Sequence, residues 1–239
     1  MPHPRPLADD FVRTIVSSMS PAFYDLCRLA GRFVKVQCIR EVVLDAHRAD
    51  RPGGLLVACT HIGHLEPFVV SSIVKRRVRW MSRMEFYQSR WKAAALNLGG
   101  AFPVDRFGNS IPAVRKAIAL ASQGEMVGIF PEGGVVKGQH AMMRGAAFKH
   151  GVCTVSVATR LPILPVVILG AHELSRVAPW LPFKRGRLYV AFGHDVLPPP
   201  RSGSRRADRL EMAGLLQAEF VRTYNDLLNR TGLQDSDIP

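Results

Sequence analysis

The sequence predicts an α/β fold in which helices flank a mostly parallel sheet, with an amphipathic helical segment at the N-terminus. Short apolar runs that suit buried strands alternate with amphipathic stretches through the middle of the chain. This alternation is typical of a parallel sheet covered by helices. The 239 residues are 47% hydrophobic and 21% charged, so the chain can bury a large core and is not disordered. Its length suits one domain, or two at most.

Residues 1–33 form the predicted N-terminal amphipathic helical segment. Phe11, Ile15, Met19 and Phe23 recur every four residues, which places them on one helical face. A proline within the stretch is expected to divide it into two helices, and basic side chains flank the apolar face. Such a helix fits a membrane interface, and it fits equally well an ordinary surface helix packed on its own domain.

Residues 34–197 form the predicted α/β domain. Its strands are predicted from short runs rich in β-branched or other apolar residues, several of them bounded by glycine or proline. These runs are residues 34–44, 55–59, 78–82, 101–104, 126–130, 163–169 and 188–192.

The helices predicted between these strands have apolar residues at helical spacing and typical end residues. Pro67 suits a first helical position, and the Gly99-Gly100 pair suits a helix C-terminus. These helices are residues 67–74, 86–98, 111–123 and 146–159.

Residues 198–239 are predicted to be a proline-rich linker followed by a C-terminal helix over residues 206–229. Leu216, Phe220 and Leu227 fall on one face of this helix together with Tyr224. We therefore expect the helix to pack on the preceding domain.

The charge balance restricts the possible partners. The chain has 32 Lys and Arg against 19 Asp and Glu, a formal net charge of +13. Such a charge suits nucleic acid, an anionic membrane or an acidic substrate, or it is simply a solvated basic surface. The densest basic cluster, residues 201–209, has no aromatic residue for stacking on bases, which argues against nucleic acid.

Four scattered cysteines without a CxxC pair exclude a disulfide scaffold and a zinc-finger framework, and they fit a reducing compartment. No run of about 20 apolar residues suits a transmembrane helix, and the N-terminus lacks the apolar run of a signal peptide. If the protein acts on lipid, we therefore expect it to lie on the bilayer.

A histidine follows the predicted buried strand 55–59. His61 is separated by four residues from Glu66, at the point where Pro67 opens a helix. Histidine suits a general base for a hydroxyl, and a carboxylate on its far nitrogen would fix the tautomer and stabilise the imidazolium. A structural histidine is the simpler alternative. A metal site that includes His64 lacks a second ligand pair, so no metal is expected.

Two further motifs follow predicted strands. Glu132 and Gly133 lie in the run Phe-Pro-Glu-Gly-Gly, where glycines let the backbone approach a ligand and offer N–H groups to an anion. Arg106 ends the run that begins at Gly99, and arginine suits bidentate binding of phosphate. A simple turn and a surface ion pair are the structural alternatives.

These motifs, in this order, resemble the glycerolipid acyltransferase family, typified by bacterial lysophosphatidic acid acyltransferases. The family pattern is His-x4-Asp, Gly-x-x-Phe-x-x-Arg and Phe-Pro-Glu-Gly, followed by a proline-punctuated apolar strand that is similar to residues 161–167. Glu66 stands here in place of the usual Asp, and the Arg that usually follows Phe-Pro-Glu-Gly is missing. Arg83 is similar to a lysine that family members often carry.

The resemblance implies direct transfer without an acyl-enzyme. His61 would take the proton of the acceptor hydroxyl, oriented by Glu66, and the oxygen would attack the thioester. Arg106 and Arg83 would hold the acceptor phosphate, and Lys137 can replace the missing Arg. Remaining roles would be a loop-fixing contact from Glu132 and oxyanion binding by N–H groups near Gly133.

The resemblance also implies the partners. The acceptor would be lysophosphatidic acid and the product phosphatidic acid, with acyl-CoA or acyl-carrier protein as co-substrate, no other cofactor and no nucleic acid. The protein would work on an anionic membrane surface at the cytoplasmic side, as a peripheral or monotopic protein. Acylation of another lysophospholipid or glycolipid, or a non-catalytic basic membrane-binding module, remain alternatives.

Overall fold

The computed structural model describes residues 24–26, 29, 39–63, 66–105, 107–170 and 186–235. The predicted amphipathic segment 1–33 lies outside the described residues except for residues 24–26 and 29, which are helical. Arg106 and His64 also lie outside them. No helix within the described ranges is both long enough and apolar enough to span a membrane.

Within the described residues, seven strands form one sheet in the order β1-β7-β6-β2-β5-β3-β4. Neighbours from β6 to β4 are parallel, whereas β7 is antiparallel to β6, and β1 is parallel to β7. The mostly parallel sheet is therefore confirmed, with two strands at one edge running the other way. The strands are β1 Ile39–Leu44, β2 Leu55–Cys59, β3 Val78–Arg83, β4 Phe102–Val104, β5 Met126–Ile129, β6 Ile163–Leu169 and β7 Gly186–Phe192.

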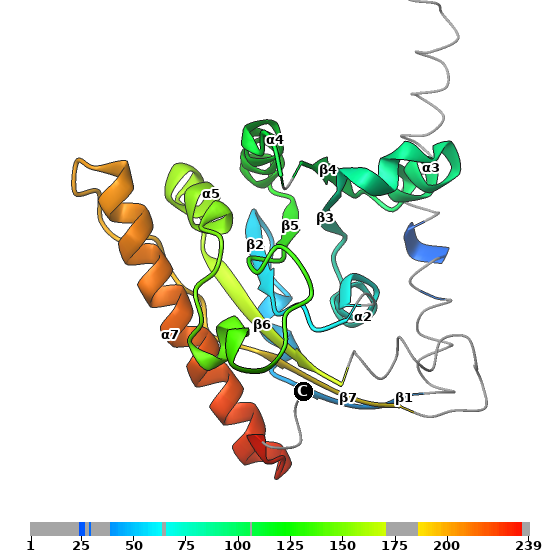
Figure 1. Ribbon diagram of the computed structural model, residues 1–239, viewed down its shortest axis with the longest axis vertical. Helices are drawn as coiled ribbons and strands as arrows, with labels where there is room; N and C mark the ends of the chain where they lie inside the picture. Colours follow the sequence, from blue (N-terminus) through cyan, green and yellow to red (C-terminus); the bar gives the residue numbers. More distant parts are fainter. Residues whose placement is uncertain are drawn as a thin grey trace, which may run out of the picture.

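Helices cover both faces of this sheet (Figure 1). Helices α4, α5 and α7 lie along one face and α2 on the other, while α3 lies beside β4. The α-helices are α2 Glu66–Ile73, α3 Arg90–Leu98, α4 Ile111–Ser122, α5 Gly151–Thr159 and α7 Arg205–Thr231. Short 3₁₀ segments are η1 Ala46–Ala49, η2 Met84–Gln88, η3 Gly138–His140 and η4 Met142–Arg144.

Two predicted helices differ from the structure. The helix predicted over residues 146–159 begins only at Gly151, because the Lys149 N–H donates to the carbonyl of Pro131 at 3.0 Å and ties this segment to the loop after β5. The helix predicted over residues 86–98 is divided into η2 and α3 at Ser89, whose extended backbone interrupts it. Both differences come from loops that border the site described below.

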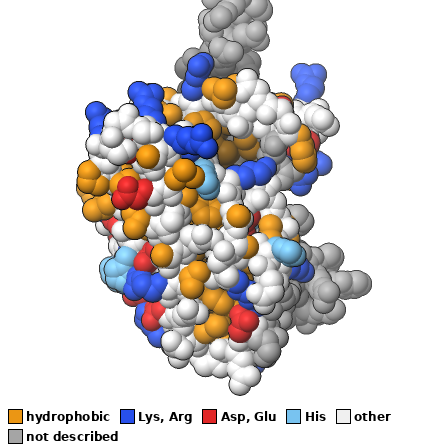
Figure 2. Space-filling model, turned by 60° about the vertical axis from the view of Figure 1, so that its left-hand side comes forward, with side chains coloured by type: hydrophobic (Ala, Val, Ile, Leu, Met, Phe, Trp, Pro, Cys, Tyr) orange, Lys and Arg blue, Asp and Glu red, His pale blue; other side chains and the backbone are white. Residues whose placement is uncertain are grey.

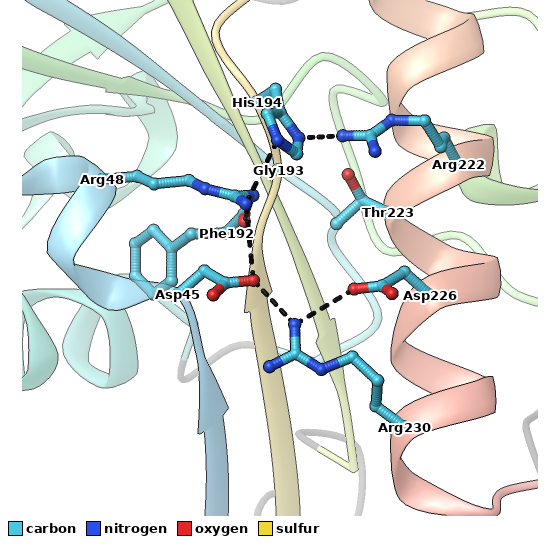
Figure 3. Close-up of a pocket in the computed structure, with 9 residues that line it drawn as sticks. All are labelled: Asp45, Arg48, Phe192, Gly193, His194, Arg222, Thr223, Asp226 and Arg230. Carbon is cyan, nitrogen blue, oxygen red and sulfur yellow. Dashed lines mark hydrogen bonds and ion pairs between the residues drawn. The ribbon is translucent and has the colours of Figure 1, made fainter.

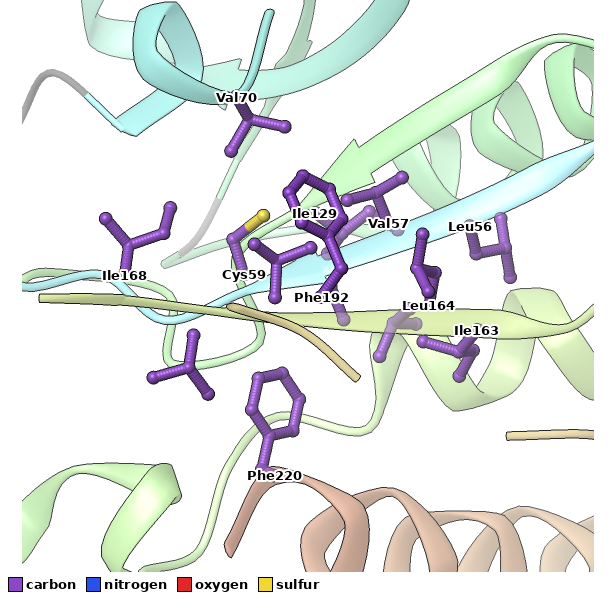
Figure 4. Close-up of a cluster of buried hydrophobic side chains, with 14 of the residues drawn as sticks. Leu56, Val57, Cys59, Val70, Ile129, Ile163, Leu164, Ile168, Phe192 and Phe220 are labelled. Atoms are coloured by element: carbon purple, nitrogen blue, oxygen red, sulfur yellow. The ribbon is translucent and has the colours of Figure 1, made fainter. Parts of the chain in front are cut away.

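The core extends on both sides of the sheet (Figure 4). Every residue of β2 and β6 is buried, as their continuous apolar runs predict. Val70 from α2 packs on one face, and Phe220 from α7 packs on the other. The face of α7 predicted from the sequence is buried, including Leu216 and Leu227.

The C-terminal end of β2 is fixed by a buried threonine. The Thr60 hydroxyl accepts a hydrogen bond from the Ile168 N–H at 2.9 Å, and the Thr60 N–H donates to the Val166 carbonyl at 3.1 Å. Buried polar groups without such partners are costly, so these bonds hold the chain in register at the point where it leaves the sheet. His61 is the next residue.

Candidate active site

The backbone of His61 is held on both sides by the loop after β5. Its N–H donates to Glu132 Oε2 at 2.7 Å, and its carbonyl accepts from the Val136 N–H at 2.9 Å. The other oxygen of Glu132 accepts from the Met142 N–H at 2.9 Å. Burial raises the pKa of Glu132, and its two N–H partners offset that rise only in part. Glu132 thus joins the loops that follow β2 and β5.

The side chains of His61 and Glu66 meet beside the sheet. Nδ1 of His61 lies 3.4 Å from Oε2 of Glu66, whose side chain is fully buried at the first position of α2. The other oxygen of Glu66 accepts from the Gly63 N–H, which fixes the carboxylate. A contact of 3.4 Å is slightly longer than a hydrogen bond, and such contacts often tighten when substrate binds. The predicted pair therefore lies together, while its catalytic role stays a prediction.

The two cysteines described in the structure are poor nucleophiles. Burial, and then the negative charge of Glu66, raise the pKa of Cys59 well above its usual value. Burial raises the pKa of Cys153 to about 12. Because the thiolate is the reactive form, neither side chain offers a covalent route at neutral pH.

An aromatic stack supports the imidazole. The ring centroid of His61 lies 4.4 Å from that of Phe130, and Phe130 stacks on Trp80 at 5.1 Å. The Trp80 indole N–H donates to the Ser71 hydroxyl of α2 at 2.9 Å. Trp80 also lies directly over Gly128, where an added Cβ would come within 2.4 Å of the indole. The stack thus links β3 and β5 to the helix that carries Glu66.

An apolar groove of about 670 Å³ opens beside His61. Figure 2 shows hydrophobic side chains in a hollow of the surface, with Lys and Arg side chains around it. The volume is in the range of pockets that bind small molecules. Its apolar walls include Phe68, Met81, Phe86, Leu96 and Val114. The groove can therefore hold an alkyl chain against the imidazole.

The predicted cationic residues are placed differently. Arg83 lines the groove; its guanidinium lies 5.3 Å from the Phe86 ring centroid and 3.8 Å from the nearest oxygen of Glu85. Lys137 is exposed and is not among the described residues that line the groove. The prediction for Arg106 lies outside the described residues.

Gly133 lines the groove and has a φ of +71°, a conformation that favours glycine. Its own N–H donates to the Phe130 carbonyl at 3.0 Å, so that group closes a turn. Gly134 lies on the groove wall beside it. The predicted N–H donors near Gly133 are thus restricted to its neighbours.

The sequence interpretation noted that the stretch 148–151 is similar to the family, but it assigned no role to Lys149 and did not predict the Trp80–Phe130 stack. Lys149 lines the groove beside Gly133. The sequence interpretation placed it inside a helix, whereas α5 begins only at Gly151. Trp80 had no signal, because strand periodicity does not tell which neighbour an aromatic ring will contact.

A second, polar pocket of about 200 Å³ lies between η1, the end of β7 and α7. His194 lies between the guanidinium groups of Arg48 and Arg222, and Arg230 lies between Asp45 and Asp226 (Figure 3). No group of three His, Cys, Asp or Glu side chains among the described residues is placed to hold a metal ion.

Two relatives resemble the chain. It is 28% identical over 144 residues to the 1-acyl-sn-glycerol-3-phosphate acyltransferase of Bacillus subtilis (strain 168), covering 60% of this chain and 67% of that protein. The crystal structure of the 1-acyl-sn-glycerophosphate (LPA) acyltransferase PlsC from Thermotoga maritima matches with a TM-score of 0.62 at 16% identity, covering 93% of this chain and 84% of that one. The latter similarity supports the α/β fold.

The family model named Acyltransferase matches residues 41–169, a region that runs from β1 to the end of β6. This region contains the His61–Glu66 pair, the hydrogen bond from the His61 N–H to Glu132, and most of the residues that line the groove. Since the match covers more than half of the chain, the protein belongs to the Acyltransferase family.

Proposed function

We propose that the protein transfers a fatty acyl group from an acyl thioester to the free hydroxyl of lysophosphatidic acid, which yields phosphatidic acid. The contact of His61 with the buried Glu66 at the wall of an apolar groove carries this proposal. An acyl chain needs an apolar site and an alcohol needs a base, and both lie together here. The name of the Bacillus subtilis relative supports the same acceptor.

The proposed reaction is a direct transfer. Nδ1 of His61 faces Glu66, and Nε2 would take the proton from the acceptor hydroxyl. The acceptor oxygen attacks the thioester carbonyl carbon, and the tetrahedral intermediate collapses with loss of the thiolate, which takes the proton from the imidazolium. Glu66 would hold the tautomer and stabilise the imidazolium between these steps.

The loop after β5 supports this chemistry. Glu132 uses both oxygens on backbone N–H groups, so its proposed role is to fix the position of His61. The oxyanion would be met by N–H groups next to Gly133, because the Gly133 N–H already closes a turn. Arg83, on the groove wall, is a proposed ligand of the anionic acceptor.

The proposed lipid substrate and product are both amphiphiles that reside in the bilayer, which supports a protein that acts at the membrane surface. The net charge of +13 favours an anionic surface, since each Lys or Arg close to it is worth about 1 kcal/mol. We therefore place the protein at the cytoplasmic side of the membrane, as a peripheral or monotopic protein. The donor would be acyl-CoA or acyl-carrier protein.

Thiol release from an acyl-CoA, followed with and without lysophosphatidic acid, tests the proposal. We expect acceptor-dependent release and a product of the mass of phosphatidic acid. His61→Ala should lower the rate by about 10²- to 10⁴-fold. His47→Ala, which changes an exposed histidine outside the groove, is the matched control and should keep the rate.

Release that does not depend on any lysolipid, or a rate that survives His61→Ala, would contradict the proposed chemistry. A panel of lysophospholipids with larger head groups belongs in the same assay. A clear preference for one of them over lysophosphatidic acid would move the acceptor to that lipid and leave the reaction type intact.

A further inference from the structure

Lys149 lies against the glycine turn that follows β5. Its Cδ, Cε and Nζ are each 3.1 Å from the position that a Cβ on Gly133 would occupy. Glycine at this position therefore gives the lysine side chain room to lie along the turn. Both residues line the same groove as His61.

The lysine is tied to the loop that holds His61. Its backbone N–H donates to the Pro131 carbonyl at 3.0 Å, and the next residue, Glu132, binds the His61 N–H at 2.7 Å. Through these two hydrogen bonds, the backbone of Lys149 is connected to the loop that positions the imidazole of His61.

Among the described residues, no carboxylate forms an ion pair with the ammonium group of Lys149. Both oxygens of Glu132, the closest carboxylate along the loop, are occupied by backbone N–H groups. Within the part of the chain that the structure describes, the Lys149 side chain has no hydrogen-bond or ion-pair partner. A charge held beside an apolar groove without a counter-ion favours an anionic ligand.

Arg83 and Lys137 are less well placed than Lys149 to bind an anion beside His61. Arg83 reaches the wall formed by η2, where Glu85 lies 3.8 Å from its guanidinium. Lys137 belongs to the same loop as Gly133 but is exposed away from the described groove residues. Of the described basic side chains that line the groove, Lys149 is the one in contact with the turn beside His61.

We propose that Lys149 binds the phosphate monoester of the acceptor while His61 removes the proton from its hydroxyl. This inference rests on the proposed function and names a residue that sets its substrate class. A lysine ammonium is a compact point charge on a flexible stem, so it can follow the phosphate as the acceptor oxygen moves toward the thioester. Lys149 thereby makes phosphate-bearing acceptors better substrates than neutral ones.

Steady-state kinetics with two acceptors and one acyl-CoA test this role. Lysophosphatidic acid carries the phosphate, and a monoacylglycerol with the same chain lacks it. We expect Lys149→Gln to raise the KM for lysophosphatidic acid about tenfold or more with little change in kcat, since a charged hydrogen bond is lost. The KM for acyl-CoA and the kinetics with monoacylglycerol should stay as in the wild type, and Lys149→Arg should restore most of the loss.

Lys116→Gln is the matched control, because it removes the same charge from an exposed lysine of α4 that does not line the groove, and it should leave every KM unchanged. The inference is overturned if Lys149→Gln leaves the KM for lysophosphatidic acid unchanged, weakens both acceptors equally, or raises the KM for acyl-CoA instead. If the wild type acylates lysophosphatidic acid and Lys149→Gln matches it, this inference alone fails. If the wild type does not acylate it, the proposed function fails as well.

Discussion

Charged groups are held differently in the polar pocket beside α7 and in the groove beside His61. In the polar pocket the charges face one another. Arg48 donates to the Phe192 carbonyl at 2.7 Å, and Arg230 donates to Asp45 at 2.8 Å and to Asp226 at 3.3 Å (Figure 3). The charges there hold α7 against η1 and the end of β7.

Beside the groove, Glu66 is fully buried against His61 at 3.4 Å. On the groove wall, Lys149 extends along a glycine turn without a carboxylate partner among the described residues. The two sites also lie on strands that run in opposite directions, because β7 is antiparallel to β6 while β2 is parallel to it. The comparison teaches that paired charges indicate attachment between elements, whereas incompletely paired charges beside an apolar groove indicate a site for substrate.

Substitution of Glu66 should lower the activity more than any other change considered below. Glu66→Gln keeps the size of the side chain but removes the charge that would stabilise the imidazolium. We expect kcat to fall by about 10²- to 10⁴-fold with little change in the KM for the acceptor. Kinetics with acyl-CoA and lysophosphatidic acid measure both constants, and a raised KM at unchanged kcat would argue against an orienting carboxylate.

Gly128→Ala tests whether the aromatic stack positions His61. The new Cβ would lie 2.4 Å from the Trp80 indole, so the ring must move, and with it the Phe130 ring that contacts His61. We expect a loss of about 1–3 kcal/mol in the free energy of unfolding, together with a lower kcat.

Gly214→Ala is the matched control for this prediction. Gly214 lies in α7 with no atom within 4 Å of an added Cβ, so alanine should stabilise the helix slightly and leave kcat unchanged. Urea unfolding of both variants measures the free energy of unfolding, and steady-state kinetics measure kcat. A wild-type kcat in Gly128→Ala would show that the stack is only structural.

Glu219→Gln should have the smallest effect, confined to stability. Burial alone would raise the pKa of Glu219, but hydrogen bonds from Arg222 and the His194 N–H outweigh it and lower that pKa. Because the folded state favours the ionised carboxylate, its contribution is present above the ordinary glutamate pKa of 4.5 and is lost as the pH falls through the lowered pKa.

We therefore expect Glu219→Gln to lower the free energy of unfolding by about 1 kcal/mol at neutral pH. This difference from the wild type should disappear in acid, while kcat stays unchanged. Urea unfolding from pH 7 to pH 3 measures the effect. A difference that grows as the pH falls would contradict the direction of the shift.

Most strands and helices of the central domain could be predicted, because buried positions are occupied by apolar residues that recur at strand or helix spacing. The predicted strands 55–59 and 163–169 agree with β2 and β6, and the predicted face of α7 is buried. The predicted start of α5 at residue 146 was wrong. The true start at Gly151 depends on a hydrogen bond between the backbones of Lys149 and Pro131, which are far apart along the chain. Periodicity carries no signal for such a bond.

The order of residues was enough to show which residue types stand at the ends of buried strands, and therefore that His61 and Glu66 were candidates for acid–base chemistry. Tertiary structure alone decided that Glu132 holds the His61 backbone, that Lys149 lies on the groove and that Lys137 does not. The physical reason is that strand and helix patterns depend on local burial, whereas the direction of a loop side chain depends on contacts with chain segments distant in sequence.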